Sequence, residues 1–363
     1  MNSVYLRCLI NLYTNQKLCV KWSNYKSPMF TAYNGVKQGG ILSPLLFGSY
    51  MDELLAKLRS SGAGCHMGPY FCGALSYADD ICLLSPSIEG LRQLINVCEE
   101  FAVEYNVNFN GDKSQLIKFN PKKGTTEINS DYVYVKGCKV TCSDSVMHLG
   151  HTLYSDPNQD DLQSVVNNFN RQYNAFRAKF QCVPPQVRNS LFISYCTSLY
   201  GIQLCSLQKS HKLHVTYRKA LRNMWGLPYR THCALLPCIT DSLCSEHMCA
   251  KRFLNFAKSV LHHDSSVVKY IFTCALKCRN STFNNNITHC SRICNIQVDT
   301  LTEETGLNAH HAAQQACQDN CFNYVDIATA SAIKDCMLVA SGQFTSVFSI
   351  SEALSLSYYI CVN

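Results

Sequence analysis

The sequence lacks any apolar run long enough to cross a membrane. None of its apolar stretches reaches the roughly 18 residues that mark a spanning helix. The amino-terminal stretch also lacks the apolar core of a signal peptide, because Arg7 interrupts it and Asn2, Asn11 and Asn15 surround it. We therefore expect no membrane contact and an intracellular protein, either nuclear or cytoplasmic.

Charged residues are scarce as well, at 16% of the 363 residues, and they are unevenly placed. The segment from Leu162 to Thr240 contains no Asp or Glu. Its positive residues are Arg171, Arg177, Lys179, Arg188, Lys209, Lys212, Arg218, Lys219, Arg222 and Arg230. A field of one sign attracts a polyanion, so this segment predicts a surface that contacts nucleic acid. The alternative is a solvated helical face, although such faces usually mix both signs.

Cysteine, by contrast, is abundant, with 23 residues. Without a secretory signal, we expect reduced and mostly buried thiols rather than disulfides. One group with a spacing that could hold structural zinc is formed by Cys274, Cys278, His289 and Cys294. Chance clusters are expected in so cysteine-rich a chain, and the pairs Cys233/Cys238 and Cys317/Cys321 are nearly as suitable. We therefore do not expect bound zinc.

Two short apolar runs flank a pair of adjacent carboxylates in the stretch FCGALSYADDICLLS, residues 71–85. The runs predict two buried strands joined by a tight hairpin, and Asp suits such a turn because it tolerates a left-handed backbone. Asp79 and Asp80 would repel each other and resist burial unless their charge were compensated. A divalent cation would compensate it, and Mg²⁺ prefers oxygen ligands. The alternative is a solvated hairpin turn.

A glycine-flanked polar loop precedes this hairpin. It is built from Gly35, Lys37, Gln38, Gly39 and Gly40. The glycines allow close approach of the backbone to a ligand, and the two polar side chains offer hydrogen-bond donors. Ser43 as N-cap and Pro44 as first helical residue predict a helix whose apolar residues recur at helical spacing from Phe47 to Leu58. Such a braced loop suits a nucleotide or template base, and the alternative is an ordinary loop-to-helix turn.

The following segments extend the pattern. Ser87 can cap a helix that ends near Tyr105, and residues 114–119 read as a strand with Lys113 at its start. Residues 132–140 and 146–154 read as a strand pair. Helix, two strands, helix and strand make up most of a split βαβ sandwich, without its first strand.

In this order and spacing, the motifs resemble the palm and thumb of reverse transcriptases of non-LTR (LINE-type) retrotransposons. The matching pieces are GVKQGGILSPLLF (35–47), YADD (77–80), the Asn110-x-x-Lys113-Ser114 segment, HLG (148–150) and YRKALRNMWGLPYRTH (217–232). The resemblance implies an α+β fold, with a partial palm of antiparallel sheet and helices on one face in residues 1–155. A helical, basic thumb in residues 156–240 and a helical extension in residues 241–363 would follow.

The resemblance also implies an activity, namely RNA-directed DNA synthesis by two-metal nucleotidyl transfer. Its substrates and cofactor would be an RNA template, a DNA primer, deoxynucleoside triphosphates and Mg²⁺. Asp79 would be the main metal ligand of the hairpin and Asp80 its neighbour with a lesser role. Tyr77 and Ala78 would lie under the primer end.

Further site residues follow from the same resemblance. Gln38, with the glycines beside it, would line the template and the incoming nucleotide. Lys113 would act as the general acid that protonates the departing pyrophosphate, unless it is an ordinary surface lysine at a strand start. His148, Leu149 and Gly150 would form the primer grip, unless they are an ordinary strand turn. The residues expected to bind nucleic acid are Arg171, Arg177, Lys179, Arg188, Arg218, Lys219, Arg222 and Arg230.

One departure from the family pattern concerns the acidic residues. The family carries a further catalytic aspartate on a strand well before the glycine loop, whereas no Asp precedes Asp52 in this sequence. Asp52 falls on the helix after the loop. We therefore expect an amino-terminally truncated fragment without fingers, which does not polymerise DNA alone and could act beside a missing amino-terminal polypeptide. The alternatives are a non-catalytic nucleic-acid-binding remnant and a decayed element without activity.

Overall fold

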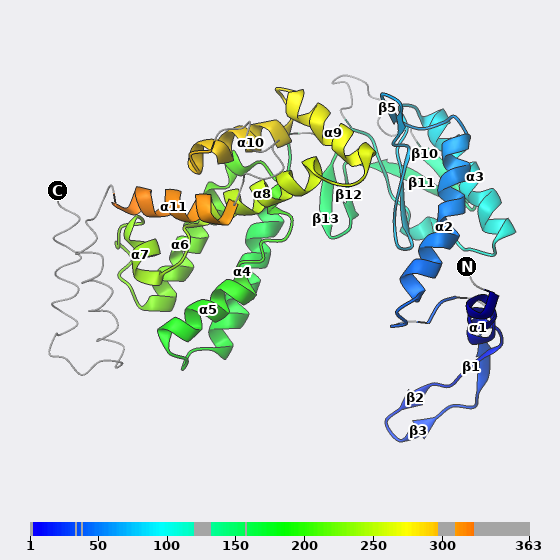
Figure 1. The fold of residues 1–363 in the computed structure, drawn as a ribbon, viewed down its shortest axis with the longest axis horizontal. Helices are drawn as coiled ribbons and strands as arrows, with labels where there is room; N and C mark the ends of the chain where they lie inside the picture. The colour runs from blue at the N-terminus through cyan, green and yellow to red at the C-terminus, as the bar shows by residue number, and fades with distance from the viewer. Residues whose placement is uncertain are drawn as a thin grey trace. The chain divides into compact units, whose positions relative to one another are not determined.

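The computed structural model describes residues 3–32, 35–37, 39–119, 132–156, 158–296 and 309–322. The chain forms two compact units (Figure 1). The first contains Met1–Leu116 and Lys123–Cys142, and the second contains Ile117–Lys122 and Ser143–Asn363. The first unit mixes helices with small antiparallel sheets, and the second is mostly helical. The expected α+β class is therefore confirmed.

The first unit opens with a helix and two nested hairpins. These elements are α1 (Ser3–Tyr13), β1 (Gln16–Leu18), β2 (Lys21–Trp22), β3 (Tyr25–Lys26) and β4 (Phe30–Ala32). Antiparallel pairing joins β1 to β4 and β2 to β3. The elements after them are α2 (Ser43–Ser60), β5 (His66–Met67), β6 (Tyr70–Phe71), β7 (Ala74–Tyr77), β8 (Asp80–Leu83) and α3 (Ile88–Glu104).

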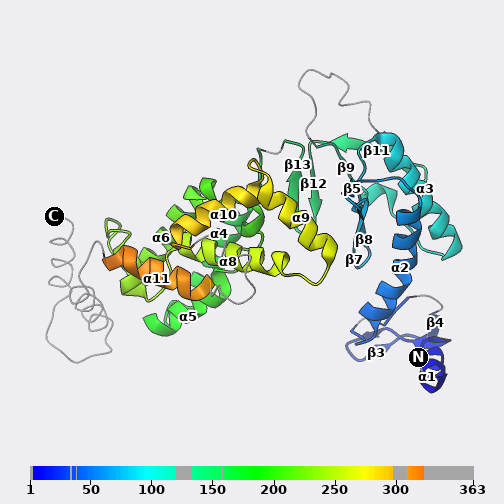
Figure 2. The same ribbon diagram turned by 45° about the horizontal axis from the view of Figure 1, so that its top comes forward.

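A three-stranded sheet follows α3. Its elements are the short 3-10 helix η1 (Gly111–Lys113) and the strands β9 (Leu116–Ile117), β10 (Tyr132–Val135) and β11 (Cys138–Ser143), in the order β10-β11-β9. Figure 2 shows α3 beside this sheet. Ile95 of α3 packs against Val133 and Val140 of the sheet.

The main core of the first unit lies between α2 and α3. Its fully buried side chains are Leu54, Leu58, Leu94 and Phe101. Ala74, Ile81 and Leu83 of the β7–β8 hairpin pack against this core. α3 begins as predicted, because the Ser87 hydroxyl accepts a hydrogen bond from the amide of Gly90 at 3.1 Å. Two amphipathic helices therefore provide the surface on which the acidic hairpin rests.

The second unit has one described hairpin and a set of packed helices. Its elements are β12 (Ser145–His148), β13 (His151–Tyr154), α4 (Leu162–Lys179), α5 (Pro185–Cys196), η3 (Ile202–Leu204), η4 (Leu207–Lys209), α6 (His211–Trp225), α7 (Leu235–Thr240), α8 (Ser245–Leu261), α9 (Ser266–Lys277), α10 (Thr282–Ile293) and α11 (Ala309–Phe322). None of the described helices in either unit combines the length and apolar character needed to cross a bilayer.

One hydrophobic core runs through the second unit. It extends from Val165 of α4 to Ala313 of α11. The large aromatic side chains at its centre are Phe169, Phe192, Tyr217 and Phe253, each at most 1% exposed. Residues expected in the thumb and residues expected in the carboxy-terminal extension therefore contribute to the same core. The apolar faces of the helices in one segment are buried against those of the other.

Candidate functional site

The β7–β8 hairpin presents the two adjacent aspartates at its tip. Tyr77 pairs with Asp80, which leaves Ala78 and Asp79 as a two-residue turn. Ala78 has a φ angle of 53°, in the left-handed region. The expectation that an aspartate would adopt this conformation is wrong, because the alanine does so. The left-handed conformation costs a non-glycine residue roughly 1–2 kcal/mol, and such strain often occurs in functional turns.

The strands of this hairpin are only partly covered, which corrects the expectation of two buried strands. One face, with Ala74, Ile81 and Leu83, packs on the core of α2 and α3. The other face is open, and Tyr77 is 66% exposed there. Among the described residues, neither β7 nor β8 pairs with a third strand, so nothing in that part of the chain continues the sheet.

The carboxylates of Asp79 and Asp80 are both exposed. Because side chains alternate along a strand, Asp80 lies on the open face with its pairing partner Tyr77. Two neighbouring carboxylates in this position can share a divalent ion. No third acidic, histidine or cysteine side chain among the described residues completes a metal-binding group with them. The pair therefore fits part of a metal site.

The glycine loop is tied to the start of α2 by Ser43. Its hydroxyl donates to the carbonyl of Lys37 at 2.5 Å, and its amide donates to the carbonyl of Gly40 at 3.1 Å. A Cβ on Gly40 would lie 2.7 Å from the Ser43 hydroxyl oxygen and 3.1 Å from the Lys37 carbonyl oxygen, so a larger residue would disturb the hydrogen bond between them. The prediction of Ser43 as N-cap is wrong: Leu42 is the N-cap residue, and the serine hydroxyl bonds the loop instead. Gln38 lies outside the described residues.

Loop and hairpin both use α2 as their support. In Figures 1 and 2 the β7–β8 hairpin runs beside α2, with its turn toward the end of α2 at which the loop joins. Lys37 and Gly39 are exposed in this loop. Gly35 and Gly39 have φ angles of 100° and 77°, which a larger residue would adopt only with strain. The fold therefore brings two sequence-predicted pieces onto one helix.

Lys113 follows a sharp turn built by Asn110. The Asn110 side chain accepts a hydrogen bond from the Lys113 amide at 3.2 Å, and its carbonyl accepts one from the Ser114 hydroxyl at 2.9 Å. Gly111 is buried, and a Cβ there would lie 2.6 Å from Cys138 Cβ. The Asn-Gly-x-Lys-Ser segment is thus a compact turn against the three-stranded sheet, with the Lys113 side chain exposed.

The His148-Leu149-Gly150 segment forms the turn between β12 and β13 in the second unit. Leu149 and Gly150 both have positive φ angles, 48° and 78°, as a two-residue hairpin turn requires. The Tyr200 hydroxyl donates to the Leu149 carbonyl at 3.0 Å. The Tyr200 ring also stacks on His151, with ring centroids 4.7 Å apart. This hairpin is therefore fastened to the helical unit by aromatic contact and a hydrogen bond.

Three of the predicted nucleic-acid-binding arginines have partners outside their own helix, whereas Arg171 donates to Asn168 Oδ1 of its own helix at 3.1 Å. The Arg188 guanidinium donates to the carbonyls of Gln181, Val183 and Met224 at distances of 2.6–3.1 Å. Arg222 donates through Nε and Nη2 to the Thr231 carbonyl at 3.1 and 2.9 Å. Arg218 Nη1 lies 3.9 Å from Glu246 Oε1. A phosphate would have to compete with these contacts.

The other predicted contact residues are exposed. They are Arg171, Arg177, Lys179, Lys219 and Arg230. Arg177 and Arg188 line a pocket of about 230 Å³ together with Tyr173 and Asn223. The Tyr173 hydroxyl donates to the Ala220 carbonyl at 3.1 Å and lies 3.0 Å from Asn223 Oδ1, so the pocket wall is held by hydrogen bonds.

The zinc spacing seen in the sequence has no counterpart in the structure. Among the described residues, Cys274, Cys278, His289 and Cys294 do not bring their ligand atoms into one metal-binding group. Cys244, His247 and Cys317 do so instead. The sequence signals only the Cys-x-x-His pair of this second group, since its third member lies far along the chain on another helix.

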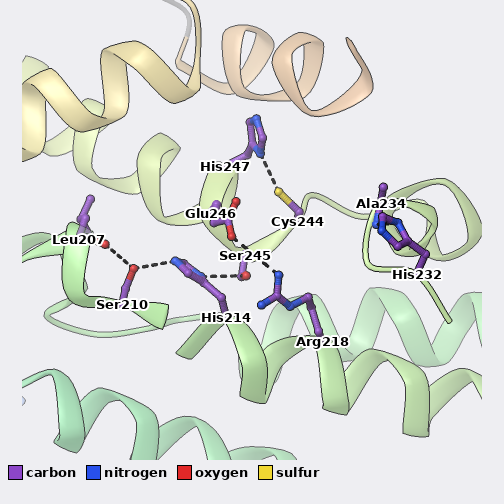
Figure 3. A network of polar contacts seen from close by, with 10 residues as sticks. All are labelled: Leu207, Ser210, His214, Arg218, His232, Ala234, Cys244, Ser245, Glu246 and His247. Carbon is purple, nitrogen blue, oxygen red and sulfur yellow. Dashed lines mark hydrogen bonds and ion pairs between the residues drawn. The ribbon is translucent and has the colours of Figure 1, made fainter. Parts of the chain in front are cut away.

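A buried polar network was also not predicted from the sequence. His214 of α6 lies between the hydroxyls of Ser210 and Ser245, at 2.6 and 2.9 Å (Figure 3). All three residues are buried. Burial lowers the pKa of His214 to about 4. The only available sequence signal was a histidine on the apolar stripe of a helix, which does not reveal hydroxyl partners.

Comparisons with known proteins agree with the motifs. Residues 2–153 match the family model described as "Reverse transcriptase (RNA-dependent DNA polymerase)". A Pol polyprotein of the type-2 retrotransposable element R2DM of Drosophila melanogaster is 31% identical over 132 residues, 36% of this chain and 12% of that protein. A Pol polyprotein of the type-1 element R2 of Nasonia vitripennis is 38% identical over 88 residues, 24% of this chain and 8% of that protein. The alignment thus spans a small part of these relatives. The resemblance to non-LTR reverse transcriptases is confirmed.

Proposed function

We propose that this chain, a non-LTR reverse transcriptase in its motifs and in the family match of residues 2–153, contributes the catalytic hairpin and nucleotide loop of an RNA-directed DNA polymerase. In this proposal residues 1–155 are a partial palm, residues 156–240 a thumb and residues 241–363 an extension packed on the thumb. One observation carries the proposal: exposed Asp79 and Asp80 stand on the open face and turn of a hairpin braced on the helix that holds the glycine loop.

The acidic pair has the principal role in this proposal. Asp79 and Asp80 would hold a divalent ion, Mg²⁺ by its preference for oxygen ligands. When bound, the ion supplies positive charge to the triphosphate and to the primer oxygen. Tyr77 and Ala78 would support the primer end from the same open face.

Other residues would position the substrates. Lys37, Gln38 and the neighbouring glycines would contact the template base and the incoming nucleotide. Lys113 would donate a proton to the departing pyrophosphate. The β12–β13 turn at His148, Leu149 and Gly150 would hold the primer. The exposed cations Arg171, Arg177, Lys179, Lys219 and Arg230 would contact the phosphates of template and primer.

The 363 residues alone would not extend a primer. Two carboxylates neutralise only part of the charge of two divalent ions, and among the described residues no third ligand stands beside Asp79 and Asp80. By the resemblance, the third carboxylate is the aspartate that the family carries on a strand before the glycine loop, and we infer that catalysis needs it. In the described part of the chain neither β7 nor β8 pairs with a further strand, and this supports the inference, because exposed strand edges readily accept one.

Primer extension tests the proposal. The purified chain would be assayed with an RNA template, a DNA primer, the four nucleotides and Mg²⁺ or Mn²⁺. We expect no extension by the chain alone, and extension when an upstream polypeptide bearing the family's aspartate-containing strand is added. Asp79→Ala should abolish the restored activity, whereas Asp52→Asn, on the exposed side of α2, should not. Clear extension by the chain alone, lost on Asp79→Ala, would refute the requirement for a second piece.

A second candidate function is nucleic-acid binding without catalysis. The observation that favours it is the absence of acidic residues from Leu162 to Thr240, combined with the exposure of seven Lys and Arg residues there. Binding should then persist in Asp79→Ala and weaken steeply with salt. Failure of the upstream polypeptide to restore extension, with such binding intact, would favour this candidate.

A further inference from the structure

Three potential metal ligands converge where α8 meets α11, outside the polymerase motifs. Cys244 is the N-cap residue of α8, His247 lies in the first turn of that helix, and Cys317 belongs to α11. The two sulfurs and one ring nitrogen of His247 all lie within 4.8 Å of one another. Cys244 Sγ is 2.6 Å from His247 Nδ1, and the Cys244 amide donates to Cys317 Sγ at 3.5 Å. Figure 3 shows the His247 ring directed at the Cys244 sulfur.

The orientation of the His247 ring suits a ligand. Nδ1 faces the Cys244 sulfur at 2.6 Å, and the backbone of Ile293 also interacts with the ring. Metal-binding histidines are commonly oriented by a second partner of this kind, often a backbone carbonyl.

The burial and chemistry of the group narrow the choice of metal. His247 is 3% exposed and Cys317 4% exposed, whereas Cys244 is half-buried. Two sulfurs and one imidazole nitrogen are a poor donor set for Mg²⁺ or Ca²⁺, which prefer oxygen. They match Zn²⁺, which accepts cysteine and histidine in tetrahedral sites. Cys-x-x-His at a helix start is also a compact way to supply two ligands from one turn.

We propose that Cys244, His247 and Cys317 bind one Zn²⁺ ion, with the fourth position open to water. Binding converts the two thiols to thiolates and releases two protons to solvent. The ion would fasten α11 to the start of α8, and so close the long chain segment between His247 and Cys317. This role is structural and independent of the proposed polymerase activity.

Metal analysis of the full 363-residue chain tests the site. Protein purified with zinc present and then dialysed should retain about one zinc per chain. Cobalt added to the zinc-free protein should give thiolate-to-cobalt charge-transfer absorption and tetrahedral visible bands. Cys244→Ser and Cys317→Ser should each lose most of the bound metal. Cys278→Ser, an exposed cysteine of the spacing-based group, should keep it.

Several outcomes would overturn the proposal. The first is that zinc-free protein gives no cobalt bands. The second is that Cys278→Ser loses as much metal as Cys244→Ser. The third is that peptide mapping without reduction finds a disulfide between Cys244 and Cys317. The cobalt spectrum is measured on the unaltered chain, so the test remains decisive even if a variant fails to fold. A lower melting temperature after chelation, absent in Cys317→Ser, would support the structural role.

Discussion

The hydroxyl of Ser210 lies 2.6 Å from Nε2 of His214 in the interior of the second unit. The same hydroxyl donates to the Leu207 carbonyl at 2.5 Å, so it must accept from His214. Nε2 therefore carries the proton, and Nδ1 accepts from the Ser245 hydroxyl at 2.9 Å. The neutral imidazole satisfies both of its nitrogens in this arrangement, and protonation would leave the Ser245 proton without its acceptor.

The second unit should consequently become less stable in mild acid. Burial is the main cause that lowers the pKa of His214 to about 4, with a smaller effect in the same direction from Arg218 and an opposite one from Glu246. Between this value and the unfolded value of 6.5 the unfolded chain binds more protons, so the free energy of unfolding decreases as pH falls through that window. Across the whole window the contribution of His214 is on the order of 3 kcal/mol.

The measurement compares the original chain with His214→Gln in urea unfolding of the second unit at pH 7 and pH 5. We expect the variant to be less stable at pH 7 and to show a smaller loss between the two values. Burial also lowers the pKa of His247 and His289, so some pH dependence should remain in the variant. An unchanged pH dependence in His214→Gln would contradict the assignment.

The left-handed conformation of Ala78 should destabilise the β7–β8 hairpin. Ala78→Gly should relieve the left-handed strain and stabilise the β7–β8 hairpin by about 1 kcal/mol. Ala78→Val should destabilise it, because a branched side chain tolerates this conformation poorly. Hydrogen exchange of the Leu84 amide, bonded to the Gly73 carbonyl at 2.8 Å, reports the change. Slower exchange in Ala78→Val than in Ala78→Gly would contradict the argument.

Arg188 should matter more for stability than for nucleic-acid binding. Its guanidinium bonds three carbonyls, so Arg188→Gln should lower the free energy of unfolding of the second unit by about 2–4 kcal/mol. Arg177→Gln is the matched control, since this exposed neighbour lines the same pocket, and its effect should stay within about 0.5 kcal/mol. Equal losses in the two variants, measured by urea unfolding, would contradict the structural role of Arg188.

Binding of single-stranded RNA should depend on salt through the exposed cations. Replacing both Arg177 and Lys179 by Gln should weaken binding similarly for all sequences and reduce the slope of log K against log salt by roughly 1 per lost phosphate contact. Lys269→Gln, on exposed α9 outside the acid-free segment, is the control and should leave the slope unchanged. If the double variant and the original chain gave the same salt slope, Arg177 and Lys179 would not contact the RNA phosphates.

The sequence alone determined the class of the chain and the local shape of its motifs. Helical spacing placed α2 and α3, and the Ser87 cap placed the start of α3, because these features act between residues close along the chain. The order of the glycine loop, YADD, Lys113 and HLG was enough to predict the resemblance to reverse transcriptases, which the match of residues 2–153 to the reverse transcriptase family model confirms.

Tertiary structure decided how the residues are used. Ser43 bonds the glycine loop instead of capping its helix, Ala78 takes the strained turn position, and Arg188 holds backbone carbonyls. These outcomes depend on the three-dimensional course of the backbone, which decides which groups come within bonding distance, and residue spacing does not contain this information. Cys317 reaches Cys244 and His247 for the same reason: helices distant in sequence pack to bury their apolar faces, and their polar residues meet as a consequence.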